Sequence, residues 1–377
     1  LEPLRTRSAG PAAGALRYGE PVLETRLTRM TPQGPVYRGR LAVDLVHEGH
    51  PFAAVAELLW TGHLPARAEA AARWAGAAAE GPGGGRERAW LGERARDLAR
   101  LLPAGSGPLA ALALVLPALA AFDPLRFDTR PDAVLARARR LLPVLAASFA
   151  LALEPKRLPA ALDTTDPAQA LARALGLRET RRGQELLRAM LILCADHELN
   201  ASTFAARVAA STAADLHACL GAAVAAFSGP RHGGASEQVE RLVLEAGEPA
   251  RAAAAVGDRL RRGERLPGFG HPLYPEGDPR APPIVERALA LAPRSPRLRT
   301  VLAVAEAVHA TGRPRANVDV AIAAGCAALD LPVGLGAAIF AVGRLAGWVA
   351  NVLEQQASGA VLRPRARFVE GEGPAAA

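Results

Sequence analysis

The apolar content of this chain is carried by alanine and leucine, which restricts the folds open to it. Hydrophobic residues make up 50% of the 377 residues, whereas aromatic residues make up only 4%. Alanine and leucine are among the strongest helix formers, and the β-branched and aromatic runs that mark strands are scarce. We therefore expect an all-α protein. A chain of this length can form a large core and can hold two domains.

Breaks in the apolar pattern predict one main body and one smaller unit. Residues 1–20 have no periodicity and predict a flexible tail. Residues 21–228 are mostly apolar and helical, and they end in a glycine- and proline-rich segment that breaks the chain as a hinge would. Residues 229–325 are more polar and richer in loops. We expect a small inserted domain at 229–325 and a large domain formed by 21–228 and completed by 326–377.

The basic charge of the chain has two explanations. The formal net charge is +8 and the isoelectric point is about 10.4, which is typical of proteins that bind polyanions. However, arginine supplies nearly all of the basic residues, acidic residues are scattered among them, and guanidinium stays charged at every relevant pH. Solvated faces are the favoured explanation, and we expect no nucleic-acid partner. A surface for a nucleotide-like cofactor stays open as the alternative.

The cysteines and the longest apolar run argue against a metal site and against a membrane span. Cys194, Cys219 and Cys326 lie far apart in apolar stretches without metal-ligand spacing. They predict buried free thiols, which suits a reducing cytoplasm, and no metal centre. The apolar run at 334–353 carries Arg344 at its middle, where a charge costs about 2.5–3.5 kcal/mol in a membrane. We interpret this run as a buried helix of a soluble protein.

Three histidines stand in distinctive local strings. His197 precedes Asn200, a good N-cap residue, so it lies just before a predicted helix start. His232 lies in G-P-R-H-G-G-A, also before a helix, where the positive end of the helix dipole disfavours imidazolium. A neutral histidine there can donate a hydrogen bond to a developing enolate oxygen. His271 lies in G-F-G-H-P-L-Y, whose glycines allow a bent backbone close to a ligand.

Charged residues complete the set of candidates. Asp319 lies in N-V-D, which opens a predicted helix running to Leu329, and a first-turn carboxylate is favoured in the ionised form that a general base needs. Arg280 follows in D-P-R, Arg344 interrupts the long apolar run, and Arg363 leads R-P-R. Each residue taken alone has an ordinary explanation as a helix cap, a satisfied histidine or a buried ion pair. Their occurrence together and in order favours a site.

The ordered strings resemble the citrate synthase family. They are H-E-L-N-A-S-T-F at His197, G-P-R-H-G-G-A at His232, G-F-G-H-P-L-Y with D-P-R at His271, N-V-D at Asp319, and G-R-L-A-G-W with R-P-R near the end. The resemblance is strong from residue 196 to 368, and residues 37–65 resemble the family's opening helices. The G-F-G-H-P-L-Y form is similar to a citrate-synthase-like branch that carries an N-terminal helix-turn-helix domain, and we find no such domain in this sequence.

The resemblance implies an all-helical homodimer whose small domain closes over oxaloacetate and acetyl-CoA, with no tightly bound cofactor. It implies that Asp319 removes the methyl proton of acetyl-CoA, that His232 holds the thioester oxygen, and that His271 polarises the ketone of oxaloacetate and protonates the new alkoxide. The oxo-acid carboxylates would be bound by a further group of residues. It comprises His197, Arg280, Arg344 and Arg363, the last reaching in from the partner subunit. Three arginines offset a dianion and hydrogen-bond donors offset the enolate charge.

One departure from the family concerns coenzyme A. The family often has basic residues near the CoA phosphates where this chain has Pro272 and Pro275. Arg261, Arg262 and Arg265 lie just upstream and are the candidate replacements.

Four functions remain open at this point. Citrate synthase is favoured, and a 2-methylcitrate synthase using propionyl-CoA shares the same chemistry. A citrate- or acyl-CoA-cleaving relative is a third. The fourth is a sensor or regulatory module with weak catalysis, which the two prolines favour, although a sensor has no need of the base Asp319.

Overall fold

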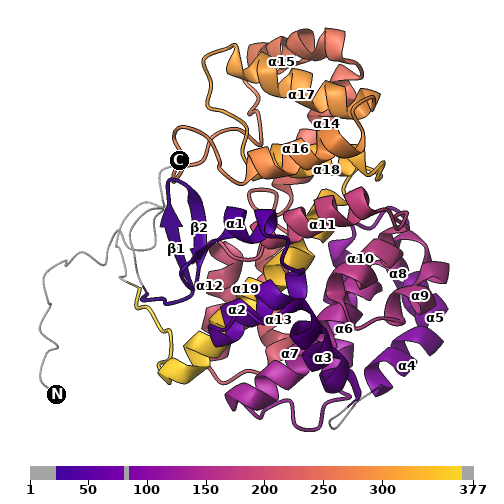
Figure 1. Cartoon of the computed structure of the whole chain (residues 1–377), viewed down its shortest axis with the longest axis vertical. Helices are drawn as coiled ribbons and strands as arrows, with labels where there is room; N and C mark the ends of the chain where they lie inside the picture. Colours follow the sequence, from indigo (N-terminus) through magenta and orange to yellow (C-terminus); the bar gives the residue numbers. More distant parts are fainter. Residues whose placement is uncertain (1–22, 80–84, 367–377) are drawn as a thin grey trace, which may run out of the picture.

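The described part of the chain is almost entirely helical, as predicted. The computed structural model describes residues 23–79 and 85–366, so the predicted tail at 1–20 lies outside the described residues. The helices of the described residues are α1 (Ala42–His47), α2 (Phe52–Thr61), α3 (Arg67–Ala79), α4 (Arg86–Glu93), α5 (Ala95–Leu101), α6 (Leu109–Ala120), α7 (Pro131–Ser148), α8 (Ala150–Leu153), α9 (Leu158–Leu162), α10 (Pro167–Leu175), α11 (Arg181–Leu193), α12 (Ala201–Ser211), α13 (Leu216–Phe227), α14 (Ala235–Ala246), α15 (Ala252–Arg261), α16 (Ala281–Leu291), α17 (Pro296–His309), α18 (Val318–Ala328) and α19 (Gly336–Ser358) (Figure 1), with short 3₁₀ helices η2 (Pro155–Arg157) and η3 (Pro249–Arg251).

A small antiparallel sheet near the start of the chain was not predicted. It consists of β1 (Thr28–Thr31), β2 (Gly34–Tyr37) and β3 (Arg40–Leu41), in that spatial order. Tyr37 is fully buried, and its hydroxyl lies 3.0 Å from the carbonyl oxygen of Ile192 and 3.1 Å from that of Asp196. The sheet therefore anchors the segment that follows α11.

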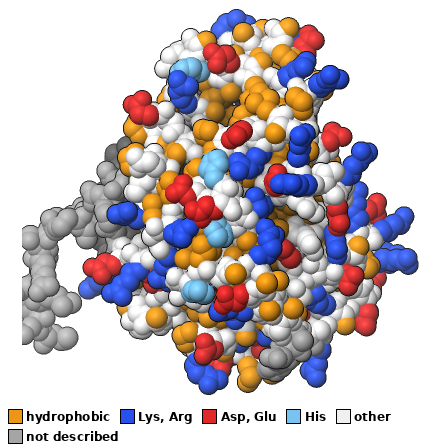
Figure 2. All heavy atoms as spheres, viewed as in Figure 1, with side chains coloured by type: hydrophobic (Ala, Val, Ile, Leu, Met, Phe, Trp, Pro, Cys, Tyr) orange, Lys and Arg blue, Asp and Glu red, His pale blue; other side chains and the backbone are white. Residues whose placement is uncertain are grey.

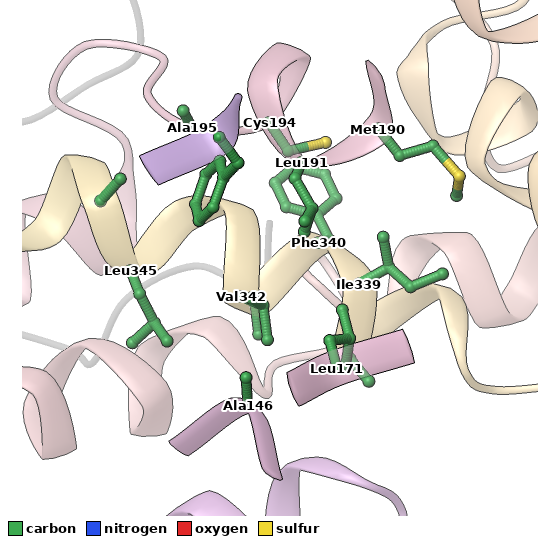
Figure 3. Close-up of a cluster of buried hydrophobic side chains, with 14 of the residues drawn as sticks. Ala146, Leu171, Met190, Leu191, Cys194, Ala195, Ile339, Phe340, Val342 and Leu345 are labelled. Atoms are coloured by element: carbon green, nitrogen blue, oxygen red, sulfur yellow. The ribbon is translucent and has the colours of Figure 1, made fainter. Parts of the chain in front are cut away.

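Helix α19 forms the centre of the hydrophobic core. It packs against α2, α7, α11, α12 and α13. Figure 3 shows Ile339, Phe340 and Val342 of α19 among side chains of neighbouring helices, including Met190 and Leu191 of α11. Burying a large apolar side chain stabilises a fold by about 1.5–3 kcal/mol. By length and composition α19 could cross a membrane, but 94% of its most apolar window is buried inside the fold. The prediction of a buried helix is confirmed.

Two glycines let α19 approach α11 closely. A Cβ at Gly343 would lie 2.6 Å from the carbonyl oxygen of Leu191, and one at Gly347 would lie 2.3 Å from that of Ala195. The backbone N–H of Gly347 donates a hydrogen bond to the same Ala195 oxygen at 2.9 Å. This contact fixes the backbone just ahead of His197.

Helices α14 to α17 lie together at the top of the view in Figure 1, with α18 at their border with the remaining helices. Within this group α14 packs against α15, α17 and α18, and α16 packs against α18. Helices α16 and α18 also contact α11, and α14 contacts α19. The border between the two parts therefore runs along α11, α16, α18 and α19.

The surface charges agree with the expectation of solvated faces. Figure 2 shows basic and acidic side chains interspersed over one face of the molecule. Several arginines pair with carboxylates, and Arg139 donates two hydrogen bonds to the buried Glu57 at 2.7 and 2.8 Å. The three cysteines are free and buried, as predicted.

Candidate active site

His197 lies in the loop between α11 and α12. The predicted cap is confirmed, because Oδ1 of Asn200 accepts a hydrogen bond from the N–H of Thr203 at 3.1 Å at the start of α12. The His197 imidazole is buried, and its Nε2 lies 3.1 Å from the hydroxyl of Tyr274. Burial, and then the positive charges of Arg280 and Arg344, hold the pKa of His197 well below its usual value. The ring is therefore a neutral hydrogen-bonding group at neutral pH.

His271 is placed by a bent loop. Gly268 and Gly270 adopt φ of 85° and 77°, and a Cβ at Gly268 would lie 2.5 Å from Cγ2 of Val239. Only glycine adopts this left-handed backbone without strain. The N–H of Gly270 donates to the carbonyl of Arg315 at 2.9 Å, which ties the loop to the segment leading into α18. The His271 ring then lies against His197, with ring centroids 5.0 Å apart.

Arg280 is buried and already has a carboxylate partner. Its Nε donates to Oδ1 of Asp278 at 2.9 Å, and its Nη2 donates to Oδ2 at 2.7 Å. Oδ2 of Asp278 also accepts a hydrogen bond from the N–H of Val318 at 3.0 Å. The D-P-R string thus forms a bidentate ion pair that is attached to the start of α18, a role for Asp278 that the sequence analysis missed.

Arg344 is a buried cation without an ion-pair partner. Its side chain is fully buried in α19, its Nε donates to the carbonyl of Cys194 at 2.7 Å, and its guanidinium lies 5.0 Å from the ring centroid of Phe340. In the part of the chain that the structure describes, it forms no salt bridge. Burial lowers the pKa of Arg344, with the charge of Asp196 opposing this effect. A buried charge is costly unless it is paired, so this guanidinium is suited to bind an anion.

His232 is held by a chain of polar contacts. Its Nε2 lies 2.8 Å from the hydroxyl of Ser202. This hydroxyl donates a hydrogen bond to Oδ1 of Asn200 at 2.7 Å and accepts one from Nε1 of Trp348 at 3.1 Å. The pKa of His232 is lowered to about 4, first by burial and then by Arg344. Helix α14 begins only at residue 235, so burial is the main cause of the neutral imidazole.

Asp319 lies in the first turn of α18, as predicted. Asn317 is the N-cap, and its Oδ1 accepts a hydrogen bond from the N–H of Asp319 at 2.9 Å. Burial raises the pKa of Asp319 to about 6, against the charges of Arg280 and Arg344, which lower it. A carboxylate with this pKa is mostly ionised at pH 7 and is a stronger base than an ordinary aspartate.

The structure brings most of the predicted residues together and leaves some apart. His197 and His271 are in ring contact, and the charges of Arg280 and Arg344 act on the pKa of both His197 and Asp319. Arg363 follows α19 and is exposed in the single chain.

The three arginines proposed for coenzyme A lie on the surface, Arg261 at the last residue of α15 and the other two just after it. Arg261 pairs with Asp258, and Arg262 pairs with Glu264. Arg265 is exposed.

Sequence reasoning also missed Ser202 and Tyr274, which were present in the quoted strings but carried no assigned role. Their contacts depend on segments far apart in the chain, such as the 30 residues between Ser202 and His232.

Comparisons with known proteins identify the family of this chain. The family model "Citrate synthase, C-terminal domain" matches residues 17–365. Citrate synthase 2 of Bacillus subtilis is 34% identical over 274 residues, which cover 69% of this chain and 72% of that protein. A 2-methylcitrate synthase of Mycobacterium tuberculosis is 31% identical over 366 residues, covering 91% of this chain and 87% of that protein.

Solved structures show the same fold. The crystal structure of citrate synthase from Thermotoga maritima has a TM-score of 0.74 with 27% sequence identity, and the match covers 94% of this chain and 95% of that chain. By its fold, its sequence and its family match, the chain belongs to the citrate synthase family.

Proposed function

We propose that this protein condenses acetyl-CoA with oxaloacetate to give citrate and coenzyme A. The observation that carries the proposal is the first turn of α18. There a carboxylate whose pKa is raised to about 6, Asp319, lies within the electrostatic reach of two buried arginines, which also act on the neutral His197. Such a group is suited to remove a weakly acidic proton, and the cations are suited to hold a dianionic partner.

The oxo acid binds first in this account. Arg344 lacks a carboxylate partner among the described residues, and it takes one carboxylate of oxaloacetate. Arg280 uses its remaining N–H groups for the other, because Asp278 engages only Nε and Nη2. Nε2 of His271 donates to the ketone oxygen, and His197 contributes a further hydrogen bond.

The reaction then proceeds by proton transfer and carbon–carbon bond formation. Asp319 accepts a proton from the methyl group of acetyl-CoA, and the electron pair of that C–H bond moves toward the thioester oxygen. His232 donates a hydrogen bond to this oxygen. The enol carbon attacks the ketone carbon of oxaloacetate, and the resulting alkoxide takes a proton from His271. Water then cleaves the thioester and releases coenzyme A.

His232 can fill this role only in one tautomer. Ser202 has a single hydroxyl proton and accepts a hydrogen bond from Trp348. Two acceptors compete for that proton, Oδ1 of Asn200 at 2.7 Å and Nε2 of His232 at 2.8 Å. The mechanism requires the proton to point to Nε2 of His232, so that the imidazole carries its own proton on Nδ1 and can donate it to the thioester oxygen. Ser202 is therefore a positioning residue in this mechanism.

The phosphates of coenzyme A need cations near the His271 loop. Arg261 and Arg262 are already engaged with carboxylates, whereas Arg265 forms no ion pair with any described residue. Arg315 lies next to the loop, because its carbonyl accepts from Gly270 and its side chain borders Gly277. We assign the phosphate contacts to Arg265 and Arg315.

The active form is a homodimer in this proposal. Helices α6, α12 and α13 pack side by side, and each presents a stripe of small apolar residues that are not buried in the single chain. The stripes include Ala113 and Pro117 on α6, Ala201 on α12, and Ala218 and Ala225 on α13. Apolar faces of this kind favour association with a second copy. Arg363, exposed in one chain, then enters the partner's site.

Two further features belong to the proposal. Residues 229–325 act as a small domain that closes over the substrates, since α16 and α18 line its border with α11. The three free, buried cysteines favour a cytoplasmic location.

A thiol-release assay with purified protein tests this function. Oxaloacetate is supplied with either acetyl-CoA or propionyl-CoA, and the release of free coenzyme A is followed. We expect a higher kcat/KM with acetyl-CoA. A higher value with propionyl-CoA would support the second candidate, a 2-methylcitrate synthase, which the match to the Mycobacterium tuberculosis enzyme favours. Absence of thiol release with both would contradict the proposed function.

A further inference from the structure

A polar cavity lies away from the reacting residues, none of which lines it. It has a volume of about 630 Å³ and lies between the α1–α2 turn, the starts of α3 and α11, helix α10 and helix α16. Helix α11 has 13 residues and meets the candidate active site at its other end, about 20 Å away at 1.5 Å per residue. Cavities of this volume are typical of sites for small ligands.

Four arginines from different elements line this cavity without carboxylate partners. They are Arg67 of α3, Arg178 ahead of α11, Arg188 of α11 and Arg287 of α16. In the described ranges none of these four forms a salt bridge. The nearby Arg173 and Arg181 do, with Glu179 and Glu185.

The acidic residues of the cavity already have partners, and one of these partners, Arg181, also lines the cavity. Glu185 pairs with Arg181 at 2.9 Å, and Glu179 pairs with Arg173 at 3.5 Å. Asp166 caps α10 by accepting hydrogen bonds from backbone N–H groups. The cavity therefore has an excess of positive charge that the protein itself does not neutralise.

Arg188 has the least favourable environment of the four. Its Nη1 donates to the carbonyl of Gly49 at 2.8 Å, and Nη2 of Arg67 donates to the same oxygen at 3.3 Å. Its Nε is buried and has no hydrogen-bond partner in the described structure. Burial lowers the pKa of Arg188, and the neighbouring Arg67 lowers it further, with the charge of Glu185 opposing them. An anion in the cavity would relieve the repulsion between these two guanidinium groups.

We propose that this cavity binds a compact anion that carries several phosphate groups. Guanidinium groups match phosphate oxygens with two parallel hydrogen bonds, and four of them line this one cavity. The start of α11 adds the positive end of a 13-residue helix. A phosphate chain, either free or as part of a nucleotide, supplies enough charge to neutralise the four cations.

Occupancy of the cavity is coupled to the oxo-acid site through α16. This helix carries Arg287 in the cavity and begins directly after Arg280, its N-cap residue. An anion that joins Arg287 to Arg67 and Arg188 fixes α16 against α3 and α11. Such coupling is reciprocal, so oxaloacetate changes the affinity for the anion by the same factor as the anion changes the affinity for oxaloacetate.

Calorimetric titration tests the site directly and does not depend on catalysis. Inorganic tripolyphosphate and adenosine triphosphate are each titrated into the full-length protein, the parent and the variants Arg188→Gln and Arg67→Gln. We expect saturable binding to the parent and about a 10- to 100-fold weaker affinity in both variants, as is typical of a lost charged hydrogen bond. Stronger binding of the nucleotide than of tripolyphosphate would identify a nucleotide as the source of the phosphates, and equal binding a free phosphate chain.

The matched control is Arg100→Gln, which removes an exposed arginine on α5 and changes the net charge equally. Its affinity should equal that of the parent. Equal affinities in the parent and in both cavity variants, or no saturable binding to the parent, would overturn the proposed site. A dissociation constant unaffected by oxaloacetate would overturn the coupling through α16.

Discussion

The backbone N–H of Leu273 donates a hydrogen bond to Nδ1 of His271 over 3.1 Å. Nδ1 is therefore an acceptor, and the neutral imidazole carries its proton on Nε2. Burial, followed by the charge of Arg280, lowers the pKa of His271, so the ring stays neutral at pH 7. The local turn at Pro272 thus sets which ring nitrogen can donate to a ketone oxygen and later protonate an alkoxide.

The pH dependence of catalysis should report Asp319. A general base is active only when ionised, and burial raises the pKa of Asp319 to about 6. We expect kcat/KM for acetyl-CoA to be level above that pH and to fall about tenfold per unit below it. The pKa of His232 is about 4, so this ring stays neutral over the same range. Initial rates measured in a stopped assay from about pH 5 to about pH 8 check this pH profile, because a group with a pKa near 6 titrates within that span. A flat profile through pH 6 would contradict the assignment of the base.

Placing an arginine at position 272 should strengthen the binding of acetyl-CoA. Pro272 is exposed and follows His271 directly, at a position that is often basic in the family. Pro272→Arg should lower the KM for acetyl-CoA and make it more sensitive to salt, because exposed ionic contacts are screened over about 10 Å at 0.1 M salt. Steady-state kinetics at two ionic strengths measure the effect, with the KM for oxaloacetate as the internal control. An unchanged KM for acetyl-CoA would mean that other arginines, such as Arg265 and Arg315, already bind the phosphates fully.

The close contact between α19 and the backbone ahead of His197 requires a glycine at position 347, which a substitution can test. A methyl group there would lie 2.3 Å from the carbonyl oxygen of Ala195 and 2.5 Å from Oδ1 of Asp196. Gly347→Ala should destabilise the fold by about 1–3 kcal/mol, as overpacking does, and should raise the KM for oxaloacetate.

The control for this variant is Gly257→Ala on α15. No atom lies within 4 Å of a Cβ at Gly257, and alanine is the better helix former by about 0.5–1 kcal/mol. Urea denaturation should show a loss of stability for Gly347→Ala and a small gain for Gly257→Ala. Equal stability of the two variants would mean that α19 can shift away from Ala195 at little cost.

Local sequence signals predicted the helices and their ends well. Asn200 was recognised as an N-cap because its side chain can satisfy free backbone N–H groups, and the N-V-D string was predicted to open a helix. In the structure Asn200 and Asn317 are the N-caps of α12 and α18. The apolar run around Arg344 was correctly interpreted as a buried helix. The sheet at residues 28–41 was not predicted, because its strands are only two to four residues long and contain glycine and proline.

Contacts between distant segments were beyond the reach of the sequence. The family resemblance pointed to Arg280 and Arg344 as equivalent ligands, whereas in the structure Arg280 pairs with Asp278 and Arg344 has no such partner among the described residues. Arg280 follows Asp278 by two residues in the sequence, whereas Arg344 stands in an apolar run. The local D-P-R string carried the signal for the Asp278 pair, but the buried backbone carbonyl that Arg344 contacts lies 150 residues away at Cys194. The cavity at Arg67, Arg188 and Arg287 is a second example, because α3, α11 and α16 meet only in the fold.

The position of Arg363 predicts a site shared between two subunits. Arg363→Ala and His232→Ala should each be nearly inactive as homodimers, since each of their sites lacks one required residue. In a mixed dimer, one active site contains both substitutions and the other contains neither. After unfolding and refolding of an equal mixture, about half of the dimers are mixed and each has one intact site, so activity should recover to about a quarter of the parent.

The control for this experiment is the refolding of each variant alone, which should give no recovery. Native mass spectrometry verifies that mixed dimers are present. If they are present without activity, Arg363 acts within its own subunit or outside the site.

The most direct test of the account is the variant Asp319→Asn, measured for both turnover and oxaloacetate binding. The change removes the base but keeps the size of the side chain, and the oxo acid is held by other residues. We expect citrate formation, followed by NMR with acetyl-CoA labelled in the methyl carbon, to fall by about 100- to 10,000-fold. Oxaloacetate affinity, measured by calorimetry, should stay within about threefold of the parent, since Asp319 makes no contact with that substrate in this mechanism. Turnover above about a tenth of the parent rate, in a variant that still binds oxaloacetate, would contradict the role of Asp319 as the base.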